Sequence, residues 1–155
     1  MLHLASQSPR RRELLARFGL PFGVLDLDIP EHPLPGEPPE AYVRRVAREK
    51  AGAGLLRVVG QPGAVVLAAD TEVILGDRIY GKPRDADDAR EMLLSLASRT
   101  HLVVTAVWLV SAAREAQAVN RSEVTFGPID AREMDAYLAS GEWQGKAGAY
   151  GIQGL

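Results

Sequence analysis

The stretch Val65–Thr71, with the sequence VVLAADT, gives the first indication of the fold. Its first five residues, Val65–Ala69, are small or branched and apolar, which predicts a strand with both faces buried. This strand is expected to end at Asp70. Ligands of α/β proteins gather at the carboxyl ends of central strands, because side chains there face a crevice lined by loops. Asp70 is therefore a candidate for chemistry, and a turn aspartate that accepts hydrogen bonds from nearby amides is the equally weighted alternative.

The composition indicates one ordinary globular domain. The chain has 155 residues, of which 46% are hydrophobic and 25% charged, and its net charge of −2 favours neither a nucleic-acid nor a membrane surface. Any anion site must therefore be local. The absence of cysteine excludes disulfides, thiolate metal sites and cysteine nucleophiles. Because the sequence has neither a signal peptide nor an apolar run of membrane-spanning length, we expect a soluble, cytoplasmic protein.

A cluster of cations follows the first predicted strand, Leu2–Ala5. Ser8 and Pro9 are typical of the N-cap and first residue of a helix, which Gly19 is expected to close. The first turn of this helix carries Arg10–Arg12, although the positive end of the helix dipole disfavours cations there. Together with the free backbone N–H groups, these arginines predict a phosphate site. An exposed basic turn without a ligand is the alternative.

Segments with strand and helix patterns alternate along the rest of the chain. The predicted strands span residues 22–29 and 65–69, a hairpin at 72–80, and an antiparallel pair at 101–110 and 117–126. The predicted helices span residues 40–58, a segment capped by Asp85 that includes Leu96, and a segment capped by Asp130 that ends at Ser140. The loop between residues 30 and 39 contains too many prolines for either a strand or a helix.

Further candidate residues lie in loops and on one helix. Glu31 is either a metal ligand or, as composition alone favours, a solvated loop charge. Lys50 falls on the apolar stripe of the helix at residues 40–58, where a lysine either acts on a ligand or extends along the surface into solvent. Lys82 lies in a constrained Gly-Lys-Pro turn, which suits a positioned cation. The glycine-rich segment Gly145–Leu155 allows the backbone to approach a ligand closely.

Taken together, several short segments in a fixed order resemble the Maf family. These segments are LASQSPRR at 4–11, REKA at 48–51, ADT at 69–71, GKP at 81–83 and KAGAYGIQG at 146–154. The resemblance implies an α/β fold with a mixed central sheet, flanking helices and a two-lobed cleft, like that of the inosine triphosphate pyrophosphatases (Maf/Ham1). It implies a single Maf-like domain over residues 1–155 and a homodimer. Family members usually have a further C-terminal strand, which we expect to be missing from this sequence.

The same resemblance implies a nucleoside triphosphate pyrophosphatase that cuts between the α and β phosphates with the help of Mg²⁺ or Mn²⁺. By position, the resemblance assigns roles to nine residues. Asp70 matches the catalytic base, and Asp70 and Glu31 match the residues at the metal. The phosphates are bound at the positions of Ser8, Arg11, Lys50 and Lys82, and the nucleobase is selected at those of Arg10, Thr71 and Gln153. The Arg, Thr and Gln set resembles the branch that acts on dTTP and UTP.

A second hypothesis comes from the link between Maf proteins and septum formation. The chain would then be a nucleotide-responsive regulator that binds a division partner without turnover. The catalytic interpretation is favoured, because a protein that only binds nucleotide has no need of a carboxylate among the phosphate ligands.

Overall fold

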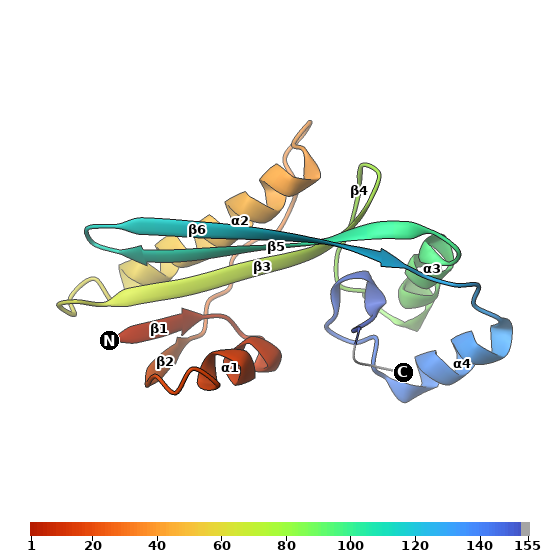
Figure 1. Cartoon of the computed structure of the whole chain (residues 1–155), viewed down its shortest axis with the longest axis horizontal. Helices are drawn as coiled ribbons and strands as arrows, with labels where there is room; N and C mark the ends of the chain where they lie inside the picture. The colour runs from red at the N-terminus through yellow and green to blue at the C-terminus, as the bar shows by residue number, and fades with distance from the viewer. Residues whose placement is uncertain (153–155) are drawn as a thin grey trace. The chain divides into compact units, whose positions relative to one another are not determined.

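The computed structural model describes residues 1–152 and contains a six-stranded mixed sheet with flanking helices (Figure 1). The elements in chain order are β1 (Leu2–Ala5), α1 (Pro9–Ala16), β2 (Phe22–Leu25), α2 (Pro39–Arg57), β3 (Val65–Leu75), β4 (Arg78–Tyr80), α3 (Ala86–Leu96), β5 (Thr100–Ser111), β6 (Glu115–Thr125), α4 (Ala131–Ser140) and a 3₁₀ turn η1 (Ala147–Ala149). The strand order is β2-β1-β3-β5-β6, and β4 pairs with β3. Since β1 is parallel to β2 and β3 while β4 is antiparallel to β3, the expected mixed α/β class is confirmed.

The chain divides into two compact units. The first unit comprises residues 1–70 and 105–120, and the second comprises residues 71–104 and the chain from 121 onward. The divisions fall inside β3, β5 and β6, so these three long strands belong to both units. The candidate carboxylate Asp70 is the last residue of β3 that belongs to the first unit.

The core of the first unit lies between α2 and the parallel strands. The stripe predicted for this helix is confirmed, because Val43, Val46, Ala47 and Ala51 are all fully buried. Close packing also requires Gly54, where an added Cβ would lie 2.8 Å from Cγ1 of Val66. That distance is below any real Cβ contact, so glycine is what allows α2 to approach the sheet.

The predicted end of the central strand was wrong. β3 does not stop at Asp70 but continues to Leu75, and the segment predicted as a separate hairpin strand is its second half. The β-branched residues after Asp70 sustain the extended backbone, and the chain turns only at Gly76, whose φ is +60°. Asp70 is therefore presented from the middle of a strand, which excludes the turn-aspartate alternative.

The second predicted strand was too long. β2 ends at Leu25 rather than at residue 29, because its only described parallel partner, β1, ends where Ala5 pairs with Leu25. The antiparallel pair is confirmed: the amide of Ser111 donates to the carbonyl of Arg114, and the amide of Phe126 donates to the carbonyl of Arg99.

The second unit packs α3, α4 and the glycine-rich segment around its own core. This core contains Val73, Tyr80, Met92, Leu93, Leu96 and Met134. The predicted N-caps are confirmed, since the carboxylate of Asp85 accepts from the amide of Asp88 and that of Asp130 accepts from the amide of Glu133. The predicted stop at Gly141 is confirmed by its left-handed φ of +75°.

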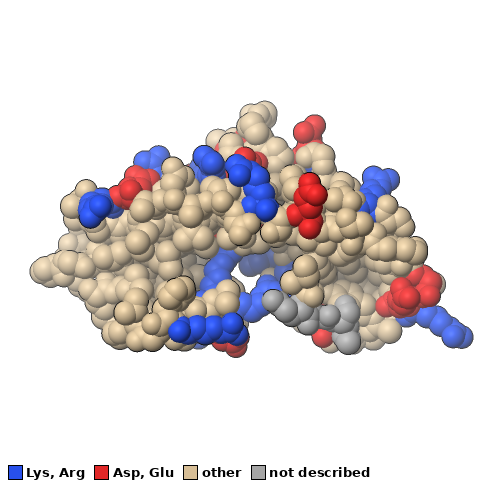
Figure 2. Space-filling model, in the orientation of Figure 1, with Lys and Arg blue, Asp and Glu red and all other residues tan. Residues whose placement is uncertain are grey.

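Charged groups do not form one extended patch on the surface drawn in Figure 2, where basic and acidic side chains are interspersed among uncharged ones. This distribution agrees with the net charge of −2. Within residues 1–152, no helix combines the length and apolar character that a membrane crossing requires.

Candidate active site

Two carboxylates and a lysine meet in the first unit. The Nζ atom of Lys50 lies 2.6 Å from Oε1 of Glu31 and 3.5 Å from Oδ1 of Asp70. Asp70 comes from β3, Lys50 from α2 and Glu31 from the proline-rich loop that precedes α2. The lysine ammonium thus bridges two acids that are 39 residues apart in the sequence.

The position of Lys50 follows from the helical repeat. Lys50 lies four residues after Val46 and on the same face, so its side chain starts from the buried side of α2. Only 17% of the side chain is exposed, and its charged end contacts Glu31 and Asp70. The alternative in which Lys50 extends into solvent is therefore excluded.

Asp70 is a buried carboxylate with an altered acidity. Burial penalises its charged form and raises its pKa above the ordinary value of 3.8, while Lys50 acts against this shift. Glu31 raises the pKa again, and Arg11 lowers it. Atom Oδ2 is buried and has no hydrogen-bond partner among residues 1–152. Asp70 therefore keeps one buried acceptor available for a proton, a water molecule or a metal ion.

The donor set is compatible with a hard divalent cation that also binds substrate. Mg²⁺ is usually held by one or two carboxylates together with water and phosphate oxygens rather than by a cage of protein ligands. Residues 1–152 contain no group of three or more His, Cys, Asp or Glu that could hold a metal alone. Glu31 and Asp70 are carboxylates of the kind that such a shared site requires, and Lys50 lies near both of them.

The N-terminus of α1 carries the predicted arginines in the first unit. Ser8 is the N-cap, as predicted, and its hydroxyl accepts a hydrogen bond from the amide of Arg11. The first turn has no acidic residue, while Arg10 is exposed and Arg11 is half-buried. Arg11 also influences the pKa of Asp70. Arg11, alone among the three arginines of this turn, is therefore identified as acting electrostatically on the carboxylate of Asp70.

The remaining candidates belong to the second unit. Thr71 directly follows Asp70 in β3, and Lys82 is exposed in the turn after β4. Gln153 lies outside the described residues. The carbonyl of Gly81, next to Lys82, accepts a hydrogen bond from the amide of Gly148. The glycine-rich segment thus fixes the turn that carries this lysine.

Position 148 accepts only glycine. Its φ is +71°, and an added Cβ would lie 2.8 Å from Cγ2 of Val73. Both the backbone conformation and the available space exclude a side chain. Gly148 thus packs against the core of the second unit, and the close approach of this segment to a ligand stays a prediction.

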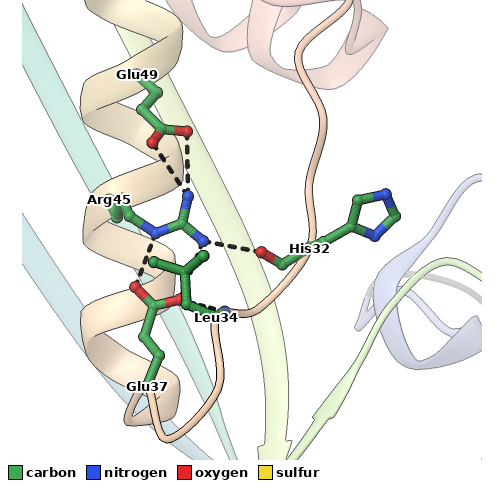
Figure 3. Close-up of polar contacts among 5 residues, drawn as sticks. All are labelled: His32, Leu34, Glu37, Arg45 and Glu49. Carbon is green, nitrogen blue, oxygen red and sulfur yellow. Dashed lines mark hydrogen bonds and ion pairs between the residues drawn. The ribbon is translucent and has the colours of Figure 1, made fainter.

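Sequence reasoning did not single out Arg45, which Figure 3 shows between Glu49, Glu37 and the main chain of His32. The spacing of four residues between Arg45 and Glu49 is a recognisable helical pair. No sequence signal relates Arg45 to Glu37, because that contact depends on how the proline-rich loop folds back onto α2.

The chain is similar to known proteins over nearly its whole length. The model of the Maf family, described as "Maf-like protein", matches residues 1–155. A protein of Xanthomonas campestris pv. campestris named dTTP/UTP pyrophosphatase is 59% identical over 99% of this chain and 82% of its own length. One of the same name from Methylococcus capsulatus is 54% identical over 99% of this chain and 75% of its own length.

A protein of Xylella fastidiosa named nucleoside triphosphate pyrophosphatase is 52% identical over 99% of this chain and 82% of its own length. Among solved structures, the Ham1 protein of Staphylococcus aureus aligns with a TM-score of 0.49 and 16% identity, over 79% of this chain and 69% of its own.

Proposed function

The chain belongs to the Maf family, and we propose that it is a nucleoside triphosphate pyrophosphatase that hydrolyses dTTP and UTP to the monophosphate and pyrophosphate. The names of the relatives at 52–59% identity support this substrate class. The observation that carries the proposal is the contact of Lys50 with both Glu31 and Asp70, next to the unpaired oxygen of Asp70.

In this proposal Asp70 is the general base. Its Oδ2 atom accepts a hydrogen bond from the attacking water and takes its proton as the water oxygen bonds to phosphorus. At the same time the bridging bond between the α and β phosphates breaks, which separates the monophosphate from pyrophosphate. A carboxylate with a raised pKa is a stronger base than an exposed aspartate, so the burial of Asp70 favours proton transfer. Lys50 holds the carboxylate in place and supplies positive charge near the phosphates.

The other residues bind and orient the triphosphate. Arg11 and Lys82 provide positive charge, and the hydroxyl of Ser8 can donate to a phosphate oxygen while it accepts the helix-capping bond. Glu31 and Asp70 would hold a Mg²⁺ or Mn²⁺ ion, which supplies charge neutralisation for the phosphates. No covalent intermediate is required.

Base choice is assigned to three residues, Arg10, Thr71 and Gln153. The Gln153 amide can pair with the N3 edge of uracil or thymine, but an amide can also flip to pair with cytosine. Arg10 can only donate hydrogen bonds, so it disfavours the amino group of cytosine. Thr71 carries a rotatable hydroxyl that accommodates either base.

A pyrophosphate-release assay tests the proposal. The protein is incubated with Mg²⁺ and, separately, dTTP, UTP, CTP and GTP. The expected result is pyrophosphate release that is fastest for dTTP and UTP. If no pyrophosphate is released from any of the four nucleotides, the enzymatic proposal is contradicted. The alternative, a regulator that only binds nucleotide, would then be favoured.

A further inference from the structure

The loop that carries Glu31 is attached to α2 through one arginine. Arg45 Nε donates to Oε2 of Glu37 at 2.7 Å, and Arg45 Nη2 donates to Oε1 of Glu37 at 3.0 Å. These paired bonds engage both carboxylate oxygens, which is the strongest geometry available to an arginine and a carboxylate. Figure 3 shows the guanidinium on the helix facing the loop.

The same guanidinium also contacts the loop near its other end. Arg45 Nη2 donates to the main-chain carbonyl of His32 at 2.9 Å, one residue after Glu31. Arg45 Nη1 donates to both oxygens of Glu49, one turn further along α2, at 3.1 and 3.2 Å. Contacts on either side of the guanidinium therefore fix its orientation between the helix and the loop.

The loop depends on such side-chain contacts. Four of the residues between 30 and 38 are prolines, which lack an N–H group, so the segment cannot join a strand ladder. It folds into a turn in which the amide of Glu37 donates to the carbonyl of Leu34 at 3.0 Å. The amide of Leu34 in turn donates to Oε1 of Glu37, the oxygen that also accepts from Arg45.

This contact is shielded from water. The side chains of Arg45 and Glu37 are only 24% and 11% exposed. The hydrogen bond from Arg45 lowers the pKa of Glu37 below its usual value, and Glu37 raises the pKa of Arg45. Both groups therefore stay charged across the physiological range, and the attachment does not switch with pH.

From these contacts we infer that Arg45 is a positioning residue for Glu31. The loop is attached to α2 at two places: at Arg45 through Glu37 and His32, and at Lys50 through Glu31 itself. Lys50 lies five positions after Arg45, which corresponds to a rise of about 7.5 Å along α2. The helix thus sets where Glu31 meets Lys50 and Asp70. This inference rests on the proposed function, in which Glu31 and Asp70 act together.

A double-mutant cycle tests whether Arg45 acts through Glu31. Arg45→Met is expected to lower kcat/KM for dTTP by about 10- to 100-fold, the range that a small misplacement of a catalytic group produces. In a Glu31→Gln background, the same change is expected to lower kcat/KM by no more than about twofold, because the positioned carboxylate is already absent. An equal loss in both backgrounds would overturn the inference, since a purely structural role does not depend on Glu31.

Two matched controls come from the same region. Arg44→Met makes the same substitution at the exposed neighbouring position of α2, and His32→Ala removes a side chain whose main-chain carbonyl, not its ring, contacts Arg45. Both are expected to leave kcat/KM within about twofold of wild type. Equal losses from these changes would show that any alteration of the loop or helix has the effect attributed to Arg45.

If Arg45→Met does not fold, Glu37→Gln replaces it. The glutamine keeps an oxygen for the amide of Leu34 but loses the charge that pairs with Arg45. It is expected to lower kcat/KM in the same Glu31-dependent manner, though by a smaller factor. A wild-type value for this variant would contradict the inference.

Hydrogen exchange gives a readout that does not need activity. In Arg45→Met or Glu37→Gln, the amides of Leu34 and Glu37, which are hydrogen-bonded within the loop, are expected to exchange at least about tenfold faster, while those of β3 keep their wild-type rates. Unchanged exchange in the loop would refute the attachment. If wild-type protein hydrolyses neither dTTP nor UTP, the proposed function fails, and this exchange measurement still decides whether Arg45 holds the loop.

Discussion

Asp70→Asn separates chemistry from folding in this site. Asparagine has the same size as aspartate and keeps an oxygen near Lys50, but it cannot take a proton from water. Loss of a general base lowers the rate by about 10²–10⁴, which corresponds to about 2.7–5.4 kcal/mol in the activation barrier. Because burial raises the pKa of Asp70 and so disfavours its charge, the neutral variant is not expected to melt below wild type.

The measurements are kcat for dTTP at saturating Mg²⁺ and the melting curve from circular dichroism. Unfolding could mimic a hundredfold loss of rate only if about 99% of the molecules were unfolded, which the spectrum would reveal. Asp77→Asn, in the exposed turn between β3 and β4, is the control and should stay within about twofold of wild type. Wild-type kcat in Asp70→Asn would refute the assignment of the base.

Three other predictions concern different parts of the chain. Gly148→Ala forces a side chain against Val73 at a positive φ, so it should destabilise the protein by about 1–3 kcal/mol and lower its Tm, and an unchanged Tm would contradict the packing argument. Burial lowers the pKa of His101 from its usual value of 6.5, so this side chain binds a proton more readily in the unfolded chain than in the folded protein. The stability of the protein should therefore fall as the pH drops below 6.5. A non-titrating His101→Gln variant should lose part of this fall in Tm between pH 7 and 5, and parallel curves would exclude His101 as its source. For base choice, kcat/KM should favour UTP over CTP, and Arg10→Ala should reduce this preference more than Gln153→Ala; an equal slowing of both nucleotides in Arg10→Ala would make Arg10 a phosphate ligand instead.

Features set by neighbouring residues were predictable from the sequence. Ser8, Asp85 and Asp130 each accept a hydrogen bond from the amide three residues later, so the helix starts depend only on local chemistry. The stop at Gly141 depends on one backbone conformation that glycine adopts without strain. The apolar stripe of α2 likewise follows from the helical period alone.

The continuation of β3 was not predictable in this way. Charged residues are rare inside buried strands, so the sequence pattern predicts that the strand ends at Asp70. The structure keeps Asp70 within the strand and places against it Lys50, from a helix that precedes β3 in the chain. The contact with Lys50 offsets the cost of burying the Asp70 carboxylate. This is a tertiary contact, so the local sequence of residues 65–75 does not reveal it.

The loop around Glu31 illustrates the same limit. Its many prolines predict a segment without regular structure, and this is correct. The pairing of Glu37 with Arg45 depends on how that segment folds onto α2, a geometry that proline content does not specify. Composition alone favoured a solvated charge for Glu31, whereas the folded loop brings it to 2.6 Å from Lys50.

Product analysis by phosphorus NMR tests the central claim most directly. Wild-type protein is incubated with dTTP and Mg²⁺, and the phosphorus resonances are followed until the substrate is consumed. The expected products are thymidine monophosphate and pyrophosphate in equal amounts, with no orthophosphate. Thymidine diphosphate together with orthophosphate would place the cleavage at the γ phosphate and exclude a pyrophosphatase that cuts between the α and β phosphates.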